Sequence, residues 1–436
     1  MELNLKQDEV IDRYFTEAVA WRRQLHRCPQ PAWLEYYATG LVAEKLTEWG
    51  YTVSLGKDVV DSEKLILSPT TEKHNEEFQR ALQFGVKEKF ITPAKGGLTG
   101  VVGVLKGSQP GPTIGFRFDI DSNEVCEASD PGHRPAREGF ASQNPGYAHM
   151  CGHDVHTAMG LLLARYFAEN REAVKGTIKF IFQPNEENLS GAAAMVSAGV
   201  VDDLDYLFSG HVGINVKRTG QIALNVNNFY ALSRFEVTYR GRASHAALRP
   251  DEGMNALLGA CAAVTNLYAI ARHGTGASRI NVGTMTAGTD WNVIPDRASF
   301  KLETRGVTDE INNYMVTKVH EVLKGAAVMY GLELEIKPGA VSCGGSNSPE
   351  LVAISSKVAQ VLPSVKEVVA EASLNASEDV TAMMERVQSR GGKAMYVLFG
   401  TPVAGGHHNA AFDVDENVIA NGAKFLASVY KEIMNG

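Results

Sequence analysis

The sequence lacks any uninterrupted apolar run near the roughly 20 residues that cross a bilayer, although 44% of its residues are hydrophobic. Its first nine residues, Met-Glu-Leu-Asn-Leu-Lys-Gln-Asp-Glu, contain neither the basic nor the apolar region of a signal peptide. Positive charge is not in excess, because 42 Lys and Arg stand against 50 Asp and Glu, a formal net charge of -8. This balance argues against a polyanion such as DNA as the partner, but it leaves a small anionic substrate possible.

Cysteine is also scarce. The five cysteines are an odd number without a repeated spacing, which is poor material for a disulfide framework. They are Cys28, Cys126, Cys151, Cys261 and Cys343. The pattern favours a reducing compartment, and we expect a cytoplasmic protein.

The 436 residues exceed what one hydrophobic core usually organises, so two domains are expected. Residues 8–50 show two amphipathic helical patterns separated by Pro29 and Pro31, and residues 51–55 resemble a strand. Residues 56–95 are charged and predict an insertion or surface cover with a helix near residues 75–89. We expect its single histidine, His74, to be exposed.

From residue 100 the pattern alternates between strands and helices. Strands are predicted at 101–105, 113–121, 176–182 and 204–212, with helices at 157–169 and 192–198. Such alternation predicts an α/β fold, with a mainly parallel sheet covered by helices on both faces. In the strand 113–121, Arg117, Asp119 and Asp121 share one face; Asp121 is equally well interpreted as a salt-bridged strand end.

The pattern changes near residue 228. Strands at 229–240, 279–286 and 298–305 and helices at 253–271 and 308–330 predict an inserted α+β lid or dimerisation domain with an antiparallel sheet and two helices. The α/β pattern then resumes with a helix at 348–362, a strand at 393–399 and a helix at 416–435. The expected domains are therefore 1–227 and 339–436 for the catalytic part and 228–338 for the inserted part.

The densest chemistry lies in the run His149-Met-Cys-Gly-His-Asp-Val-His156. Cys151 and His153 are two residues apart, so in an extended segment both side chains would leave on one side. A metal could then take sulfur and nitrogen from one short piece of backbone, with Asp154 and His156 in supporting positions. The alternative is a solvated polar loop with a buried cysteine.

Further candidates follow predicted strands. Glu186 and Glu187 come after the strand 176–182, where one carboxylate could bind metal while the other faces a water; as an isolated pair they would be a solvated surface feature. His211 ends the strand 204–212. His407 and His408 lie in a glycine-rich turn after the strand 393–399, and one of them is expected to be structural.

Five of these residues give donors of mixed softness: Cys151, His153, Glu187, His211 and His408. They suffice for two divalent ions bridged by the thiolate. Two ions assist hydrolysis, because one activates water while the other polarises a carbonyl. Sulfur, nitrogen and oxygen ligands suit zinc, manganese or cobalt and do not choose among them.

These donors, in this order, resemble the aminoacylase and carboxypeptidase G-like metallopeptidases, in the amidohydrolase branch that includes hippurate hydrolase and plant auxin-conjugate hydrolases. The matching segments are 21–26, 117–121, 149–156, 182–187, 241–246, 292–295, 377–379 and 408–413. The resemblance implies a dinuclear metal amidohydrolase that cleaves N-acyl amino acids, with p-aminobenzoyl-glutamate as the expected substrate.

The resemblance also implies roles for individual residues. Cys151, His153, Glu187, His211 and His408 would bind the two ions, and the family pattern His-Asn-x-x-Phe selects His408 over His407. Glu186 would be the general base. His245 would stabilise the oxyanion, and Asn292 and Arg305 would bind the substrate carboxylate. Asp119 and Glu378 would orient the metal ligands.

The family usually places the second domain at a dimer interface, so we expect a homodimer, or a heterodimer with a related subunit. Asn185, Asn188, Ser122 and Asn123 depart from the family pattern close to the expected site, and they bear on substrate preference. Two alternatives stay open: a hippurate, auxin-conjugate or peptide hydrolase using the same site, and a metal-binding subunit that is active only with a partner chain.

Overall fold

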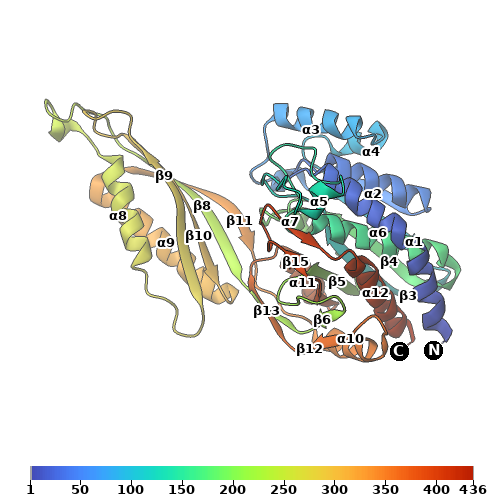
Figure 1. Ribbon diagram of the computed structural model, residues 1–436. Coiled ribbons are helices and arrows are strands. Elements are labelled where there is room, and N and C mark those ends of the chain that lie inside the picture. Colours follow the sequence, from blue (N-terminus) through green and yellow to red (C-terminus); the bar gives the residue numbers. More distant parts are fainter. Residues whose placement is uncertain (1, 436) are drawn as a thin grey trace. The chain divides into compact units, whose positions relative to one another are not determined.

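The computed structural model describes residues 2–435, and their contacts divide the chain into two compact units (Figure 1). The first unit contains Met1–Asn227, Gly345–Leu374 and Asp379–Gly436. The second contains Asn228–Gly344 and Asn375–Glu378. Across residues 2–435, no helix has both the length and the apolar character needed to cross a membrane.

The first unit is built on an eight-stranded sheet with the order β1-β2-β4-β3-β5-β14-β6-β12. Its central strands β4, β3, β5 and β14 are parallel, whereas β1 and β2 at one edge, and β6 beside β14, pair antiparallel. The predicted mainly parallel sheet is therefore confirmed at its centre. The strands are β1 (Thr52–Leu55), β2 (Val101–Lys106), β3 (Gln109–Asp119), β4 (Lys175–Gln183), β5 (Tyr206–Val212), β6 (Gln221–Ala223), β12 (Glu367–Val369) and β14 (Lys393–Phe399).

Helices cover both faces of this sheet, as predicted. On one face α6 (His153–Glu169) packs between α1 (Glu2–Arg27) and α12 (Asn417–Asn435), and on the other α7 (Gly191–Ser197) and α11 (Val380–Ser389) contact the strands (Figure 1). The remaining helices and short strands are α2 (Tyr36–Glu48), α3 (Thr71–Gln83), α4 (Glu88–Ile91), α5 (Arg134–Arg137), α10 (Pro349–Val361), β7 (Val226–Phe229), β13 (Ala372–Ala376), β15 (Val403–Ala404) and β16 (Asp413–Val414).

The alternation of side chains along β3 and β4 separates a core face from a polar face. Phe116, Phe118, Phe180 and Phe182 form a buried aromatic cluster on the α6 side. Burying one such ring stabilises the fold by about 1.5–3 kcal/mol. Arg117, on the opposite face of β3, is also buried and pairs with Asp379 at 3.2 Å. The sheet is thus fixed by apolar packing on one side and by a buried ion pair on the other.

The second unit is an antiparallel sheet with the order β11-β8-β10-β9 and two helices on one face. Val237 and Tyr239 on β8 and Phe300 and Leu302 on β10 point toward the helices and are buried with them. The strands are β8 (Ala231–Arg240), β9 (Ser278–Ala287), β10 (Arg297–Gly306) and β11 (Glu333–Ser342), and the helices are α8 (Ala256–Tyr268) and α9 (Asp309–Tyr330).

Strand β11 was not predicted from the sequence, and it runs through the expected boundary at residue 338. Pro338 and Gly339 resemble a linker, but the register of β11 against β8 shifts between Pro338 and Val341. An edge strand tolerates proline at such an irregularity, because no ladder hydrogen bond is lost there. The second unit consequently extends to Gly344.

The segment 56–95 is more closely integrated than a surface cover. His74, predicted to be exposed, is 7% exposed, and its ring lies 2.9 Å from the Tyr36 hydroxyl. Glu77 on α3 is fully buried, and its Oε2 accepts hydrogen bonds from Gln30 and Asn144, each at 2.9 Å. This carboxylate therefore connects the segment to two loops of the first unit.

We expect Glu77→Ala to destabilise the first unit, because it removes the shared acceptor of two buried amides. Hydrogen bonds to a charged group contribute about 1.5–3 kcal/mol each, so the melting temperature should fall by ~4 °C or more. Glu76→Ala on the exposed side of the same helix is the control and should change it little. Equal melting temperatures for the two variants would contradict this role of Glu77.

Candidate metal centre

The candidate residues of the first unit gather where its parallel strands end. β3 leads into Asp121, β4 into Glu186 and Glu187, β5 ends at His211 and Val212, and the loop after β14 carries His408. The carboxyl edge of a parallel sheet is where α/β proteins bind ligands. The topology thus brings together residues up to 287 positions apart in the chain, counted from Asp121 to His408.

Cys151 and His153 reach this edge through a turn, and the predicted extended segment is wrong. Gly152 has φ of 98°, and His153 is the first residue of α6. A Cβ on Gly152 would lie 2.7 Å from a methyl carbon of Val212, so glycine is required for both conformation and space. The turn places the thiol and the imidazole at the buried N-terminus of α6.

Five side chains converge into two overlapping sets of possible ligands. Cys151, His153 and His211 have donor atoms within 4.8 Å of one another, and so do Cys151, Glu187 and His408. The Cys151 sulfur lies 3.3 Å from His211 Nε2, and His408 Nε2 lies 3.4 Å from Glu187 Oε2. The thiol belongs to both sets, so it could contact both ions of a pair.

Hydrogen bonds determine which nitrogen of each buried histidine faces the centre. His153 Nδ1 lies 3.0 Å from Asp121 Oδ1, and His211 Nδ1 donates to the Val212 carbonyl at 2.9 Å. In both residues Nε2 is left to point at the cluster, as a metal ligand requires. His407 instead places its Nε2 3.1 Å from the same Val212 carbonyl, a structural contact.

Asp121 is a residue whose role the sequence did not resolve. Its Oδ1 holds His153, and its Oδ2 accepts the backbone N–H of Glu187 at 3.0 Å. One fully buried carboxylate therefore positions side chains from two segments. The sequence pattern that could have identified this role is its position on the same face of the strand as Arg117 and Asp119.

Asp119 supports the candidate metal donors indirectly, through His156. Its Oδ1 contacts His156 Nδ1 at 2.5 Å, and Arg117 pairs with its Oδ2 at 2.9 Å. His156 Nε2 accepts the backbone N–H of Val212 at 3.0 Å, so both nitrogens of His156 are engaged. His156 packs against the His211 ring with 4.6 Å between centroids and supports that ring from behind.

The electrostatics of the cluster favour a cation. Burial raises the pKa of the Cys151 thiol, and the charge of Glu187 raises it further. Burial also opposes ionisation of Glu187, but the hydrogen bond from His408 and the charges of His153 and His408 lower its pKa to about 2. A divalent ion would stabilise the thiolate and take the place of these imidazolium charges.

Two buried atoms without a hydrogen bond test whether metal ions fit. His153 Nε2 and Glu187 Oε1 lie 3.8 Å apart, too far for a hydrogen bond, and neither has a hydrogen-bond partner among the described residues. Such atoms are costly unless something binds them. Both belong to the donor sets, and thiolate, imidazole and carboxylate are ligands that zinc and manganese accept. The residues present therefore fit a pair of divalent ions.

Glu186 lies at the edge of this cluster. Its Oε2 is 3.8 Å from His153 Nε2, and the residue is 8% exposed. Its neighbour Glu187 lies at the same distance from His153 Nε2 and also contacts His408 at 3.4 Å. This further contact distinguishes the two carboxylates, as expected if Glu187 binds metal and Glu186 transfers protons.

The other predicted site residues belong to the second unit. His245 and Asn292 lie on paired loops, with the Ala246 N–H donating to the Asn292 carbonyl at 2.9 Å. Arg305 lies near the far end of β10 and pairs with Glu303 at 2.8 Å. Glu378 is buried in the segment Asn375–Glu378, and its carbonyl accepts a hydrogen bond from Ser342.

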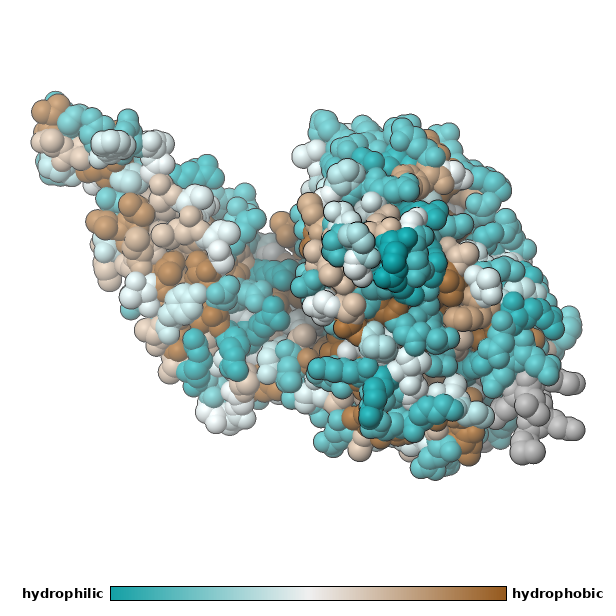
Figure 2. Space-filling view, viewed as in Figure 1, coloured by the Kyte–Doolittle hydropathy of each residue, from teal (hydrophilic) through white to brown (hydrophobic). Residues whose placement is uncertain are grey.

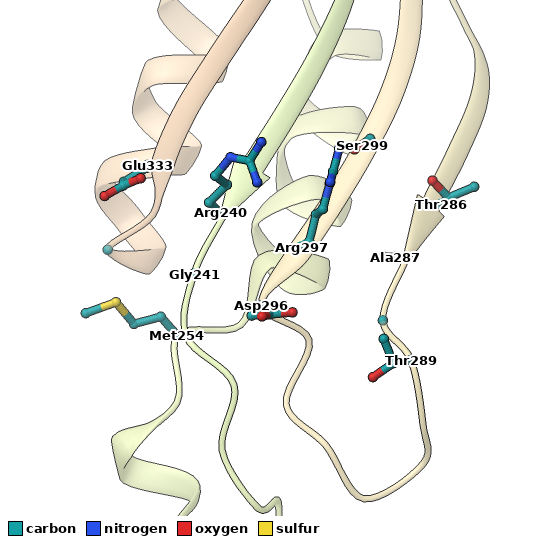
Figure 3. A pocket seen from close by; sticks show the side chains of 12 residues that line it. Arg240, Gly241, Met254, Thr286, Ala287, Thr289, Asp296, Arg297, Ser299 and Glu333 are labelled. Carbon is teal, nitrogen blue, oxygen red and sulfur yellow. The ribbon is translucent and has the colours of Figure 1, made fainter.

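A pocket of about 740 Å³ occupies the end of the second unit's sheet where the two paired loops begin (Figure 3). Arg240 and Arg297 are direct cross-strand partners there. Asp296 and Glu333 also line the pocket, so its charge is balanced. It contains none of the predicted site residues.

A thiol shared by two sets of donors, beside a buried glutamate at the carboxyl edge of an α/β sheet, defines the class of metal-dependent amide hydrolases. The model of peptidase family M20/M25/M40 matches residues 115–432. The chain belongs to this family; it is a metallopeptidase-type amidohydrolase acting on linear amides, and its donor sets fit two divalent metal ions such as zinc or manganese.

Two relatives are similar over nearly the whole chain. Indole-3-acetyl-aspartic acid hydrolase of Enterobacter agglomerans is 43% identical over 421 residues, 96% of each chain. One subunit of the p-aminobenzoyl-glutamate hydrolase of Escherichia coli (strain K12) is 44% identical over 411 residues, 93% of each chain. A crystal structure of an aminobenzoyl-glutamate utilization protein from Klebsiella pneumoniae has a TM-score of 0.82 and 37% identity, with 97% of both chains covered. The family resemblance predicted from the sequence is confirmed.

We expect Asp121→Asn to lower the metal affinity by about 10–100-fold, the usual effect of losing an outer hydrogen bond to a ligating histidine. The amide has only one acceptor oxygen, so its NH2 group would face either the Glu187 N–H or the His153 Nδ1–H, and the two contacts cannot both be kept. Chelator competition measures the effect, and Asp58→Asn on the exposed surface is the control. Unchanged affinity in Asp121→Asn would show that the carboxylate is not needed to orient His153.

Proposed function

We propose that this chain hydrolyses the amide bond between an aromatic acyl group and an acidic amino acid, with p-aminobenzoyl-glutamate as the preferred substrate and p-aminobenzoate and glutamate as products. The observation that carries the proposal is the shared-thiol cluster with Glu186 beside it. The choice of substrate draws on the two relatives, whose names specify amides of glutamate and aspartate.

In this proposal Cys151, His153, Glu187, His211 and His408 bind the two ions. When bound, such ions acidify water and polarise an amide carbonyl. Glu186 accepts the proton of the attacking water and delivers it to the leaving amine nitrogen. Its burial supports this role, because a shielded carboxylate exchanges its proton with the reactants in preference to bulk solvent.

We further propose that His245 stabilises the oxyanion and that Asn292 and Arg305 bind the substrate carboxylate, Arg305 through its planar guanidinium. From Arg297 to Arg305, β10 rises roughly 25 Å, and Asn292 lies just beyond the Arg297 end. One copy of the second unit therefore cannot bring Asn292 and Arg305 to one carboxylate. A second subunit that supplies His245 and Asn292 would resolve this separation.

The second unit carries a surface suited to such a partner. Leu258, Cys261, Thr265 and Tyr268 form the exposed face of α8, and the helix contains no charged residue. β9 beside it pairs only with β10 among the described strands, so its outer edge is open. Figure 2 shows hydrophobic surface on this unit. We propose that this face joins two chains, as a homodimer or as a heterodimer with a related subunit.

The proposed location is the cytoplasm. All five cysteines are free, and Cys126 and Cys261 are exposed. Exposed free thiols are typical of proteins in a reducing compartment.

We expect Glu186→Ala to lower kcat by about 10²–10⁴-fold, because it removes proton transfer but no metal ligand. Metal content per chain should stay equal to that of the wild type, and elemental analysis of the purified chain measures it. Retained turnover would reject Glu186 as the base. Metal loss together with turnover would instead assign Glu186 to the ligands.

The substrate is tested by comparing kcat/KM for p-aminobenzoyl-glutamate, indole-3-acetyl-aspartate, N-benzoyl-glycine and simple dipeptides. We expect the first to be hydrolysed best. A preference for indole-3-acetyl-aspartate would establish the second candidate, which the 43% identical relative favours. Metal binding without hydrolysis of any of the four, restored by a second subunit, would establish a chain that depends on its partner.

We expect Leu258→Asp to convert a dimer into a monomer, because a charge on the apolar face of α8 would be desolvated in the interface. Mass in solution, with kcat/KM on the same samples, measures the change. Val361→Asp is the control, since Val361 is similarly exposed on α10 of the first unit. A Leu258→Asp chain that keeps the wild-type mass would place the interface elsewhere.

A further inference from the structure

Glu35, directly before α2, occupies a helix N-cap position but does not cap its helix. No side-chain cap hydrogen bond is formed, whereas Asp, Asn, Ser or Thr in this position usually accepts an N–H of the first turn. The residue is fully buried. A buried carboxylate that gives up its local partner must be satisfied elsewhere.

The partners of Glu35 come from three separate segments. Oε1 accepts the backbone N–H of Trp33 at 3.0 Å and that of Asn185 at 2.8 Å. Oε2 accepts the hydroxyl of Thr99 at 2.5 Å.

Both backbone partners of Oε1 are held in an unfavourable conformation. Trp33 has φ of 63° and Asn185 has φ of 51°, in the left-handed region that favours glycine. Each such residue costs on the order of 1–3 kcal/mol and persists only where neighbouring contacts fix it. A single oxygen of Glu35 provides such a contact for both.

Asn185 directly precedes Glu186, and the turn that follows is closed at its other side. Gly191 N–H donates to the Asn185 carbonyl at 3.1 Å, and the Asn185 amide donates to Ser190 at 2.7 Å. Glu187 N–H donates to Asp121 at 3.0 Å. The backbone of Glu186 is therefore fixed on both sides, by Glu35 through Asn185 and by Asp121 through Glu187.

We propose that Glu35 is a positioning residue for this reaction, which fixes the backbone of Asn185 and thereby aims the carboxylate of Glu186. The inference rests on the proposed role of Glu186 as the base. Glu35 itself touches neither the substrate nor the metal donors. Its function is to keep the Glu186 turn in one conformation before substrate binds.

To fill this role, residue 35 needs an acceptor oxygen far enough from its own backbone to reach the N–H groups of Trp33 and Asn185. Burial raises the pKa of Glu35 to about 8, and the charge of Asp121 adds to this shift, so its surroundings favour the neutral form. Glutamine has the same length and keeps one oxygen for Trp33 and Asn185, while Thr99 can reverse its hydroxyl to accept the amide. Aspartate keeps the charge but is one methylene shorter.

The inference predicts the order of activity in three variants. Glu35→Gln should retain kcat within about threefold, whereas Glu35→Ala and Glu35→Asp should lower kcat about 10–100-fold, as expected for a misplaced catalytic group. KM and metal content should change little. If Glu35→Ala folds poorly, Glu35→Asp carries the same comparison. Wild-type kcat in Glu35→Asp, or a Glu35→Gln variant as impaired as Glu35→Ala, would overturn the proposal.

Two further measurements separate positioning from general stability. Asn347→Ala removes a buried amide of the same unit, which donates to the Leu224 and Tyr396 carbonyls at 2.9 Å, and should reduce the melting temperature without lowering kcat. In a Glu186→Ala background, adding Glu35→Asp should cost no further activity, because nothing is left to position. A full additional loss there would show that Glu35 acts through another group. Full activity of Glu186→Ala alone would instead reject the proposed base.

Discussion

The hydrogen bonds of the Asp121 carboxylate are the interaction on which the candidate site depends. One oxygen orients His153 at the start of α6 and the other fixes the backbone of Glu187 after β4, so two metal donors from different segments share one reference point. Charged side chains brought together without such an anchor would separate or shift their protonation. The anchor is effective because it is fully buried, where a hydrogen bond to a carboxylate is stronger than in water.

A second buried network secures the turn that carries Cys151 and His153. Asp154 Oδ2 pairs with Arg22 at 2.7 Å and with His26 at 2.8 Å, both on α1. Burial opposes its charge, but Arg22 and His26 outweigh burial and hold the pKa of Asp154 far below its usual value. Arg22 also pairs with Asp413 at 3.1 Å. The N-terminus of α6 is thereby tied to both ends of the chain, which explains why the donors stay in place although they come from distant segments.

Some residues of this site could be predicted from the sequence, because their residue type and their position in the chain are unusual, and others could not. Cys151 and His153 were predicted from a dense run of donor residues, and Glu187 and His211 because they follow predicted strands. The family resemblance selected His408 over His407, and the structure brings all five together. The turn at Gly152 was not predicted, because a two-residue spacing fits both an extended segment and a left-handed turn. Glu35 could not be identified, since one glutamate before an amphipathic helix resembles a solvated cap. Strand β11 was missed because proline and glycine within it were interpreted as a linker.

The segment 56–95 is linked to the site by hydrogen bonds, which makes it a part of the catalytic unit. Glu77 of this segment accepts the Gln30 amide, and the Gln30 carbonyl accepts the N–H of Ser122, the residue after Asp121. Five residues after Gln30 comes Glu35, which holds Asn185 before Glu186. The loop between α1 and α2 is therefore fixed by the segment on one side. On the other it carries Glu35 and bonds to Ser122, the residue after Asp121. A change in this segment would reach the site through the loop, because packed hydrogen-bonded elements transmit small displacements.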